Sequence, residues 1–249
     1  MKTLFKKVSS ITCIALFSIA AQAEGELANS PKRGWDGCYI GLDASVANQT
    51  DAAECVSGTW NCKDIPINNP MQKAMGSTQG LHVGYNWEIE PTYIFGLELG
   101  VQKPSLNGSA VFPTDGQYKS AETTYESLQT AQMRLGRVFD NNLLYVTGGV
   151  AWARLQTRFI NRYNNGNIIN DPNGYLENTT TTRGYIFGFG IEHAFTDNLS
   201  IGCELSQTYL QAIQFDVSTQ INAGEAQNWI FEKVNPNLTL LKFAVNYRF

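Results

Sequence analysis

The chain ends with LLKFAVNYRF, residues 240–249, and this short stretch decides the fold. Large apolar residues occupy alternate positions in it, namely Leu241, Phe243, Val245 and Tyr247. Polar or small residues stand between them: Lys242, Ala244, Asn246 and Arg248. This period of two indicates a β-strand with two different faces. The alternation runs up to Phe249, so the last element of the chain is predicted to be a strand that ends on an aromatic residue.

The same alternation recurs along the chain. Together with the last segment it predicts eight strands, at about 37–48, 78–89, 93–103, 126–139, 143–156, 184–195, 199–211 and 236–249. Short connections with turn-forming residues lie around 90–92, 140–142 and 196–198. The other four connections are long: about 49–77, 104–125, 157–183 and 212–235.

Short and long connections alternate without exception. In an up-and-down meander this places every short turn at one end and every long loop at the other, which is the layout of an outer-membrane barrel. The sequence therefore predicts an all-β fold, an eight-stranded antiparallel up-and-down transmembrane β-barrel over residues 37–249. Four long extracellular loops and periplasmic termini are part of this prediction.

Two kinds of barrel fit the alternation, because a soluble lipocalin-like barrel would bury the apolar face that a membrane barrel shows to lipid. The opposite face favours the membrane barrel, since it combines many glycines with charges of both signs. Glycines make room for long side chains inside a narrow barrel, and mixed signs allow buried ion pairs. We therefore expect an interior charge network of Glu98, Arg134, Glu192, Glu204, Lys242 and Arg248.

The N-terminus has the features of a secretory signal peptide. Three lysines precede the apolar run 8–20, and Ala21 and Ala23 form a small-x-small cleavage signature. Residues 1–23 are predicted to be cleaved, which leaves 24–36 as a short periplasmic segment. A retained membrane anchor is the alternative, although the run is shorter than the about 20 residues that a spanning helix needs.

The net charge of the chain narrows the classes of possible partner. Without residues 1–23 the chain keeps fifteen basic and twenty-two acidic residues, a net charge of −7, which disfavours nucleic acid as a partner.

An exported protein meets an oxidising compartment, so Cys55 and Cys62 are predicted to form a local disulfide. A metal site there is the weaker alternative, because no histidine lies nearby in the sequence. Cys38 and Cys203 are expected to act as small apolar side chains.

Three stretches carry a family resemblance: FGLELGVQ (95–102), RLGRVFDNNLLYVTGGVAWA (134–153) and GYIFGFGIEHAFTDNLSIGCEL (184–205). With the C-terminal stretch, they resemble the small outer-membrane β-barrel family of alphaproteobacteria. These are opacity-like, porin-family surface proteins that include major surface antigens of Brucella. In that family the chain ends in Phe, and the barrel assembly machinery recognises that end. The resemblance implies that Phe243, Val245, Tyr247 and Phe249 form an assembly signal.

The resemblance and the filled interior together predict a Gram-negative outer-membrane surface protein. We expect a structural role in envelope integrity and loop-mediated contacts with host or envelope ligands, without a wide pore. The alternatives are porin-like passage of small solutes and a haem-binding or adhesin function. An enzyme is not expected, because nucleophilic catalysis needs a base beside the nucleophile, and His82 is the only histidine in the middle of a strand. The sequence predicts no catalytic, cofactor or metal residue.

Overall fold

The computed structural model describes residues 34–55, 71–114, 117–163, 175–215 and 232–249. All regular structure in these ranges is β-strand. The strands are β1 (Gly37–Cys55), β2 (Met71–Glu90), β3 (Tyr93–Ser105), β4 (Asn107–Thr114), β5 (Gln117–Phe139), β6 (Asn142–Tyr163), β7 (Tyr175–Ala194), β8 (Leu199–Leu210), β9 (Ile213–Phe215), β10 (Glu232–Asn235) and β11 (Asn237–Arg248). The described residues include no helix that is both long and apolar enough to cross a membrane.

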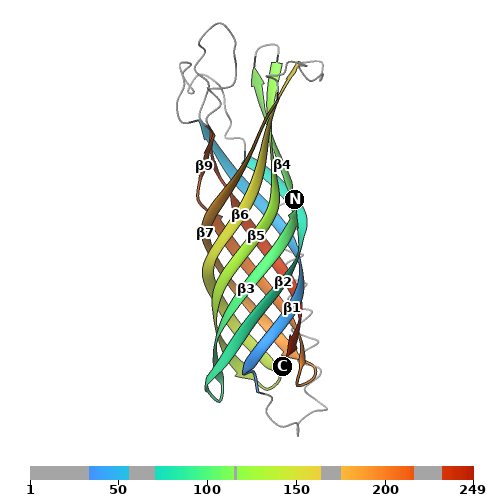
Figure 1. Ribbon diagram of the computed structural model, residues 1–249, viewed down its shortest axis with the longest axis vertical. Coiled ribbons are helices and arrows are strands. Elements are labelled where there is room, and N and C mark those ends of the chain that lie inside the picture. Colours follow the sequence, from blue (N-terminus) through green and yellow to red (C-terminus); the bar gives the residue numbers. More distant parts are fainter. Residues whose placement is uncertain (1–33, 56–70, 115–116, 164–174, 216–231) are drawn as a thin grey trace.

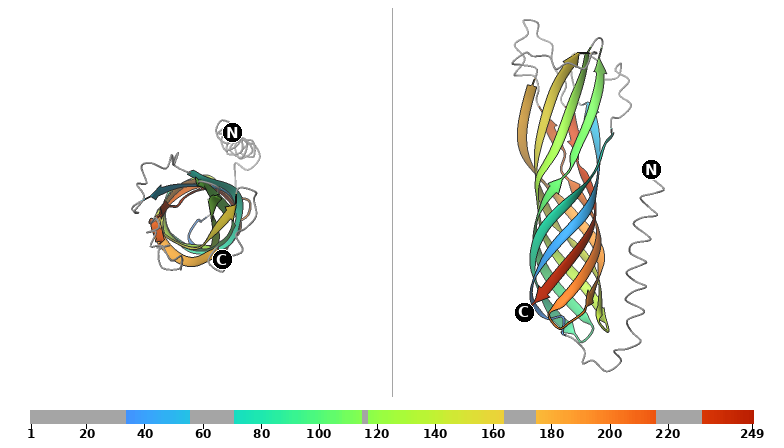
Figure 2. Two further views of the ribbon diagram at one scale, coloured as in Figure 1. Left: turned by 90° about the horizontal axis from the view of Figure 1, so that it is seen from above. Right: turned by 90° about the vertical axis from the view of Figure 1, so that its right-hand side faces the viewer.

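The strands close into a tilted barrel (Figure 1), whose ring is visible from above in Figure 2. Neighbours pair antiparallel, and β1 completes the ring by pairing with β11 from Tyr39↔Arg248 to Gln49↔Leu238. Three staves of the barrel each consist of two segments: β3 with β4, β8 with β9, and β10 with β11. The eleven segments in the described ranges therefore make eight staves, which confirms the predicted fold.

Three tight connections lie at one end of the barrel, which we term the turn end. They join β2 to β3 at Pro91, β5 to β6 at Asp140, and β7 to β8 after Ala194. Asp140 has a φ of 51°, a left-handed conformation that aspartate tolerates better than most residues. The start of β1 and the last residue, Phe249, lie at the same end, where the Phe249 N–H donates to the Cys38 carbonyl (3.0 Å).

At the opposite end, which we term the far end, the strands are longer than predicted. β1 continues to Cys55, β2 begins at Met71 and β5 begins at Gln117, inside segments that the sequence analysis assigned to loops. β6 and β7 extend in the same way. The predicted strand ends are wrong here, because the alternation changes phase at this level of the barrel, as described below.

Candidate functional site

The outward face of the barrel carries an apolar band with a sharp upper limit. Along β7 and the residue that follows it, the exposed outward residues include Phe195, Phe189, Phe187 and Tyr185, and the next outward residue is the exposed Arg183. Ten residue steps of a strand tilted by about 40° span about 25 Å, the height of the lipid-facing band of outer-membrane barrels. The same limit falls between Trp152 and Arg154 on β6. This apolar band therefore matches the thickness of a bilayer's hydrocarbon core.

Aromatic rings mark the lower edge of the apolar band at the turn end. Trp87 stacks on Phe95 with ring centroids 5.6 Å apart, and Tyr247 meets the edge of Phe249 at 5.3 Å. Arg137 interrupts the apolar face here, and its guanidinium lies 4.9 Å from the Phe139 ring centroid. A charge this close to the interface costs only about 0–1 kcal/mol. The edge has the composition of an interfacial aromatic girdle.

The middle of the barrel interior holds a dense ion-pair network. The Arg134 Nη2 atom lies 2.8 Å from Glu192 Oε2, and Lys242 Nζ lies 3.2 Å from Glu98 Oε1. Lys242 also approaches Glu204 Oε1 at 3.4 Å. All five side chains are buried. The structure therefore brings together these five residues of the expected network, and each charge has an opposite partner, as burial requires.

Arg248, the sixth residue of that set, sits at the edge of the network towards the turn end. Its Nη2 atom is 3.8 Å from Glu192 Oε1, and its Nη1 donates to the Gly34 carbonyl (2.9 Å). The guanidinium carbon also lies 4.5 Å from the ring centroid of Trp35. Arg248 therefore connects the ion pairs to the segment that precedes β1.

Four further polar side chains complete the network, and the expected set did not include them: Tyr39, Asp43, His82 and Asn246. Tyr39 donates its hydroxyl proton to Glu98 (2.8 Å) and accepts a hydrogen bond from Arg134 (3.0 Å). His82 bonds Asp43 through Nδ1 (3.0 Å) and Asn246 through Nε2 (2.8 Å). Their inward positions follow from the alternation, but their partners come from strands far apart in sequence, so spacing alone gives no signal for the pairing.

Glycines on the inward face make room for these long side chains. A Cβ at Gly84 would collide with the Tyr39 ring, one at Gly96 with the Arg134 chain, and one at Gly190 with the Tyr145 ring. Each glycine lies on a strand next to the bulky residue it accommodates. The interior is thus filled, large side chain against glycine, as an eight-stranded barrel requires.

An apolar layer closes the interior at the turn end. Trp35, fully buried, packs with the inward residues Ile94, Leu143, Tyr145 and Ala194. Its backbone N–H donates to Glu88 Oε1 (2.8 Å), which ties the segment to β2. The residues just before β1 therefore fold back into the mouth of the barrel, an arrangement that strand periodicity does not predict.

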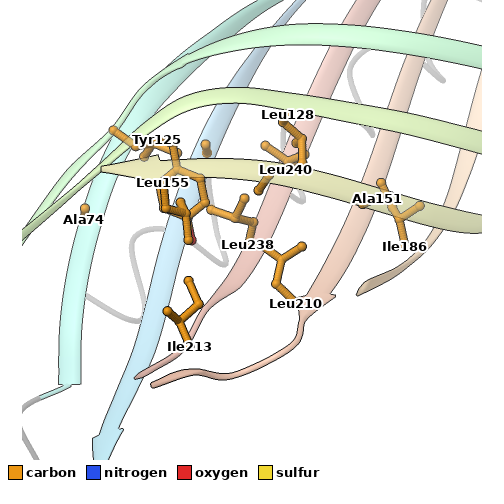
Figure 3. Close-up of a cluster of buried hydrophobic side chains, with 13 residues drawn as sticks. Ala74, Tyr125, Leu128, Ala151, Leu155, Ile186, Leu210, Ile213, Leu238 and Leu240 are labelled. Carbon is orange, nitrogen blue, oxygen red and sulfur yellow. The ribbon is translucent and has the colours of Figure 1, made fainter. Parts of the chain in front are cut away.

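A second apolar layer fills the interior near the far end (Figure 3). Its buried members are Ala47, Ala74, Leu106, Tyr125, Leu128, Ala151, Ala153, Leu155, Ile186, Leu210, Ile213, Leu238 and Leu240. We term this set the far-end layer. On β6 the inward Leu155 is buried while the outward Arg154 and Gln156 are polar. Above the apolar band the strands thus reverse their pattern, with apolar side chains inside and polar ones outside.

The structure describes only some of the remaining predicted site residues. Ala21, Ala23 and Cys62 lie outside the described residues, so the cleavage site and the Cys55–Cys62 disulfide stay predictions. Val245, Tyr247 and Phe249 of the expected assembly signal are exposed on the outer face of the closing strand, and Phe243 is half-buried there. In the ranges that the structure describes, no group of three or more His, Cys, Asp and Glu side chains could hold a metal ion.

A closed strand barrel with a lipid-facing band and a paired polar interior defines an integral outer-membrane β-barrel protein. The family model described as "Outer membrane protein beta-barrel domain" matches residues 9–249, and the chain belongs to this family. It is 25% identical to the 31 kDa outer-membrane immunogenic proteins of Brucella melitensis and Brucella suis, over 98% of this chain and 100% of each relative. The protein is therefore located in the outer membrane, and the resemblance predicted from its motifs is confirmed.

Two solved structures are also similar to the chain. The outer membrane protease OmpT of Escherichia coli matches with a TM-score of 0.51 and 9% identity, over 89% of this chain and 99% of that one. Neisserial surface protein A matches with a TM-score of 0.45 and 14% identity, over 86% of this chain and 97% of that one. At these identities the likeness concerns the fold alone.

Proposed function

We propose that the protein is a closed membrane anchor that contributes to envelope integrity and presents its far end for recognition. The observation that carries this proposal is the filling of the interior in three stacked layers. The Trp35 cluster, the ion-pair network and the far-end layer succeed one another along the barrel. A narrow barrel plugged at three levels offers no wide aqueous path, which favours anchoring over solute passage.

The turn end is assigned to the periplasm and the far end to the outside. Short turns on the periplasmic side and longer excursions outside are the rule for such barrels. The relatives in Brucella are named outer-membrane immunogenic proteins, which supports exposure of part of the chain at the surface. In the same orientation, Phe243, Val245, Tyr247 and Phe249 would serve as the signal for the barrel assembly machinery.

This orientation is tested by epitope insertion. One tag is placed between Thr114 and Gln117 at the far end, and a second between Thr196 and Asn198 at the turn end. Antibody is expected to label the first on intact cells and the second only after the outer membrane is permeabilised. Labelling in the opposite order would reverse the assignment.

The chemistry of the described histidines supports a non-enzymatic protein. Both ring nitrogens of His82 are engaged by Asp43 and Asn246 inside the barrel. His193 bonds Asn142 through Nδ1 at the turn end. These three hydrogen bonds go to an aspartate and two asparagines, and not to a Ser, Thr or Cys that could act as a nucleophile. For His82 the same engagement also disfavours ligation of haem iron, which needs a free imidazole nitrogen.

Conductance in planar bilayers separates the anchor from the porin alternative. The purified barrel, checked for folding by heat-modifiable migration on a gel, is expected to give no stable openings. Reproducible openings of uniform size would show that the three layers leave a path and would overturn the closed-anchor proposal. An envelope role predicts in addition that deletion of the gene raises sensitivity to detergent, and that the intact chain restores resistance.

A further inference from the structure

The wall of the barrel is interrupted between β7 and the stave formed by β8 and β9. The β7–β8 ladder ends at Gly184↔Leu210, followed by one more backbone bond from the Gln211 N–H to the Arg183 carbonyl (2.8 Å). The chain then turns away, and β9 pairs with β10 instead, at Ile213↔Val234. We term the gap between residues 180–183 and 211–213 the seam.

The seam exposes backbone groups of β7. In an antiparallel ladder, residues two apart direct their N–H and C=O groups to the same neighbour. Arg183 bonds towards β8, so Thr181 directs its N–H and C=O into the seam, where no backbone partner from the described residues meets them. A ligand that accepts hydrogen bonds would therefore be stabilised in this gap.

The seam opens at the upper limit of the apolar band. Arg183 is the cross-strand partner of Trp152, the last outward aromatic residue of β6. A groove of about 520 Å³ lies here, lined by residues that include Trp152, Thr180, Arg183, Ala212 and Ile213. Trp152 is also an exposed residue of the apolar band, so the groove borders the lipid-facing surface.

Arg183 differs from the other outward arginines of β6 and β7. Arg154 is paired with Glu126 at 2.6 Å, and Arg158 with Glu177 at 3.7 Å. Arg183 contacts the neutral amide of Gln211 at 3.4 Å, and the described residues place no carboxylate within ion-pair distance of it. The seam therefore presents a positive charge that an anion can neutralise.

The inner wall of the seam is apolar. Ile213 is buried in the far-end layer together with Leu210 and Leu238, and Figure 3 shows the three side chains in this cluster. On the outer surface, Arg183 and the threonines form a cationic, hydroxyl-rich rim, and the apolar band begins next to it at Tyr185 and Trp152. An amphiphile with an anionic head matches this order of surfaces.

We propose that the seam binds a phosphate-bearing anionic lipid of the outer leaflet. Its phosphate sits on Arg183 and accepts from the Thr181 N–H, and one acyl chain runs past Trp152 along the apolar band. Arginine suits phosphate because its guanidinium donates two parallel hydrogen bonds. The proposal goes beyond the anchoring function, since it depends on the position of the apolar band and not on whether the barrel conducts.

Native mass spectrometry of the full chain in detergent tests this site, with dioleoyl phosphatidic acid as the probe. The unmodified protein is expected to retain one lipid. Arg183→Gln removes the charge and Ala212→Trp fills the groove, and each is expected to weaken retention about tenfold, the loss of one charge-assisted contact. Arg154→Gln is the matched control, because it removes a rim arginine that already has a carboxylate partner, and it is expected to leave retention unchanged. Heat-modifiable migration verifies that each variant is folded.

Several results would overturn the proposal. Equal retention by Arg183→Gln and the unmodified chain, or equal loss with Arg154→Gln, would remove the assigned role of Arg183. Equal retention of dioleoyl phosphatidylcholine would mean ordinary boundary lipid, and full competition by inorganic phosphate would mean a simple anion site. A dimer abolished by Ala212→Trp would assign the seam to a second copy of the chain. None of these results bears on bilayer conductance, so the closed-anchor proposal stands or falls separately.

Discussion

Arg134 shows how a single buried residue depends on its partners. Its guanidinium contacts Glu192 and the Tyr39 hydroxyl, and its carbon lies 4.4 Å from the centroid of the Tyr145 ring. Removing one member of a buried pair leaves a charge without compensation, whereas removing both can be nearly neutral. The network therefore tolerates paired changes better than single ones.

Arg134→Met is accordingly expected to destabilise the barrel by about 3–5 kcal/mol, because Glu192 then loses its closest cation. The double variant Arg134→Met/Glu192→Gln is expected to recover most of this loss. Urea unfolding of the protein in detergent micelles, followed by tryptophan fluorescence, measures both. A double variant no more stable than the single one would contradict the assigned pairing.

Single substitutions at Leu97 and Gln79 provide a test of the lipid-facing surface. Leu97 is outward in the middle of the apolar band with 45% of its surface exposed, and Gln79 is outward above the limit of the band. Arginine costs about 2–4 kcal/mol at the bilayer midplane and about 0–1 near the interface. Leu97→Arg is expected to reduce folded protein in the outer membrane, and Gln79→Arg to leave it near normal. Similar yields from the two variants, measured by heat-modifiable migration of the membrane fraction, would argue against the band.

At the scale of the element, each long strand runs from a lipid environment into an aqueous one. On β6 the outward residues change from Val146 and Val150 inside the band to Arg154 above it, while the inward residues change from Thr147 to Leu155. Lipid outside requires an apolar outer face, and water outside requires an apolar inner one. One strand therefore carries two alternations of opposite phase.

This change of phase explains what the sequence could predict. Within the band, alternation such as Leu97 against Glu98 identifies the strands, the faces and the charged interior residues. Above it, the outward residues of β6 become polar, and the part beyond residue 156, with Arg158, resembles a polar loop because the alternation restarts with its faces exchanged. Pairings such as His82 with Asn246 arise from barrel closure, and the Trp35 contact arises from a segment with no periodicity. Such contacts depend on three-dimensional proximity, which spacing along the chain does not encode.

Leu155 and Gln156 are adjacent on β6 and provide a test of the reversed phase. Leu155→Ala is expected to cost about 2–5 kcal/mol, because it leaves a cavity in the far-end layer. Gln156→Ala, on the outward face, is expected to change stability by no more than about 0.5 kcal/mol. Urea unfolding distinguishes the two. Equal effects would mean that the far-end strands bury no core of their own.

For the whole molecule, the three interior layers are separate in composition and position. The turn-end layer is aromatic and aliphatic around Trp35, the middle is ionic, and the far-end layer is aliphatic. Stability is expected to depend on all three together, because the strands run continuously through them. Closure is expected to need only one of them, since any filled layer blocks the lumen.

The variant Trp35→Ala tests the stability of the barrel and the closure of its lumen separately. Loss of a fully buried tryptophan is expected to destabilise the barrel by about 3–5 kcal/mol. Trp87→Ala, at the same end but 41% exposed to lipid, is expected to cost distinctly less. Bilayer recordings of Trp35→Ala are nevertheless expected to stay silent, because the ion pairs and the far-end layer remain in place. Steady openings in this variant alone would show that Trp35 is the sole barrier, and that the ionic and far-end layers admit water when the mouth is open.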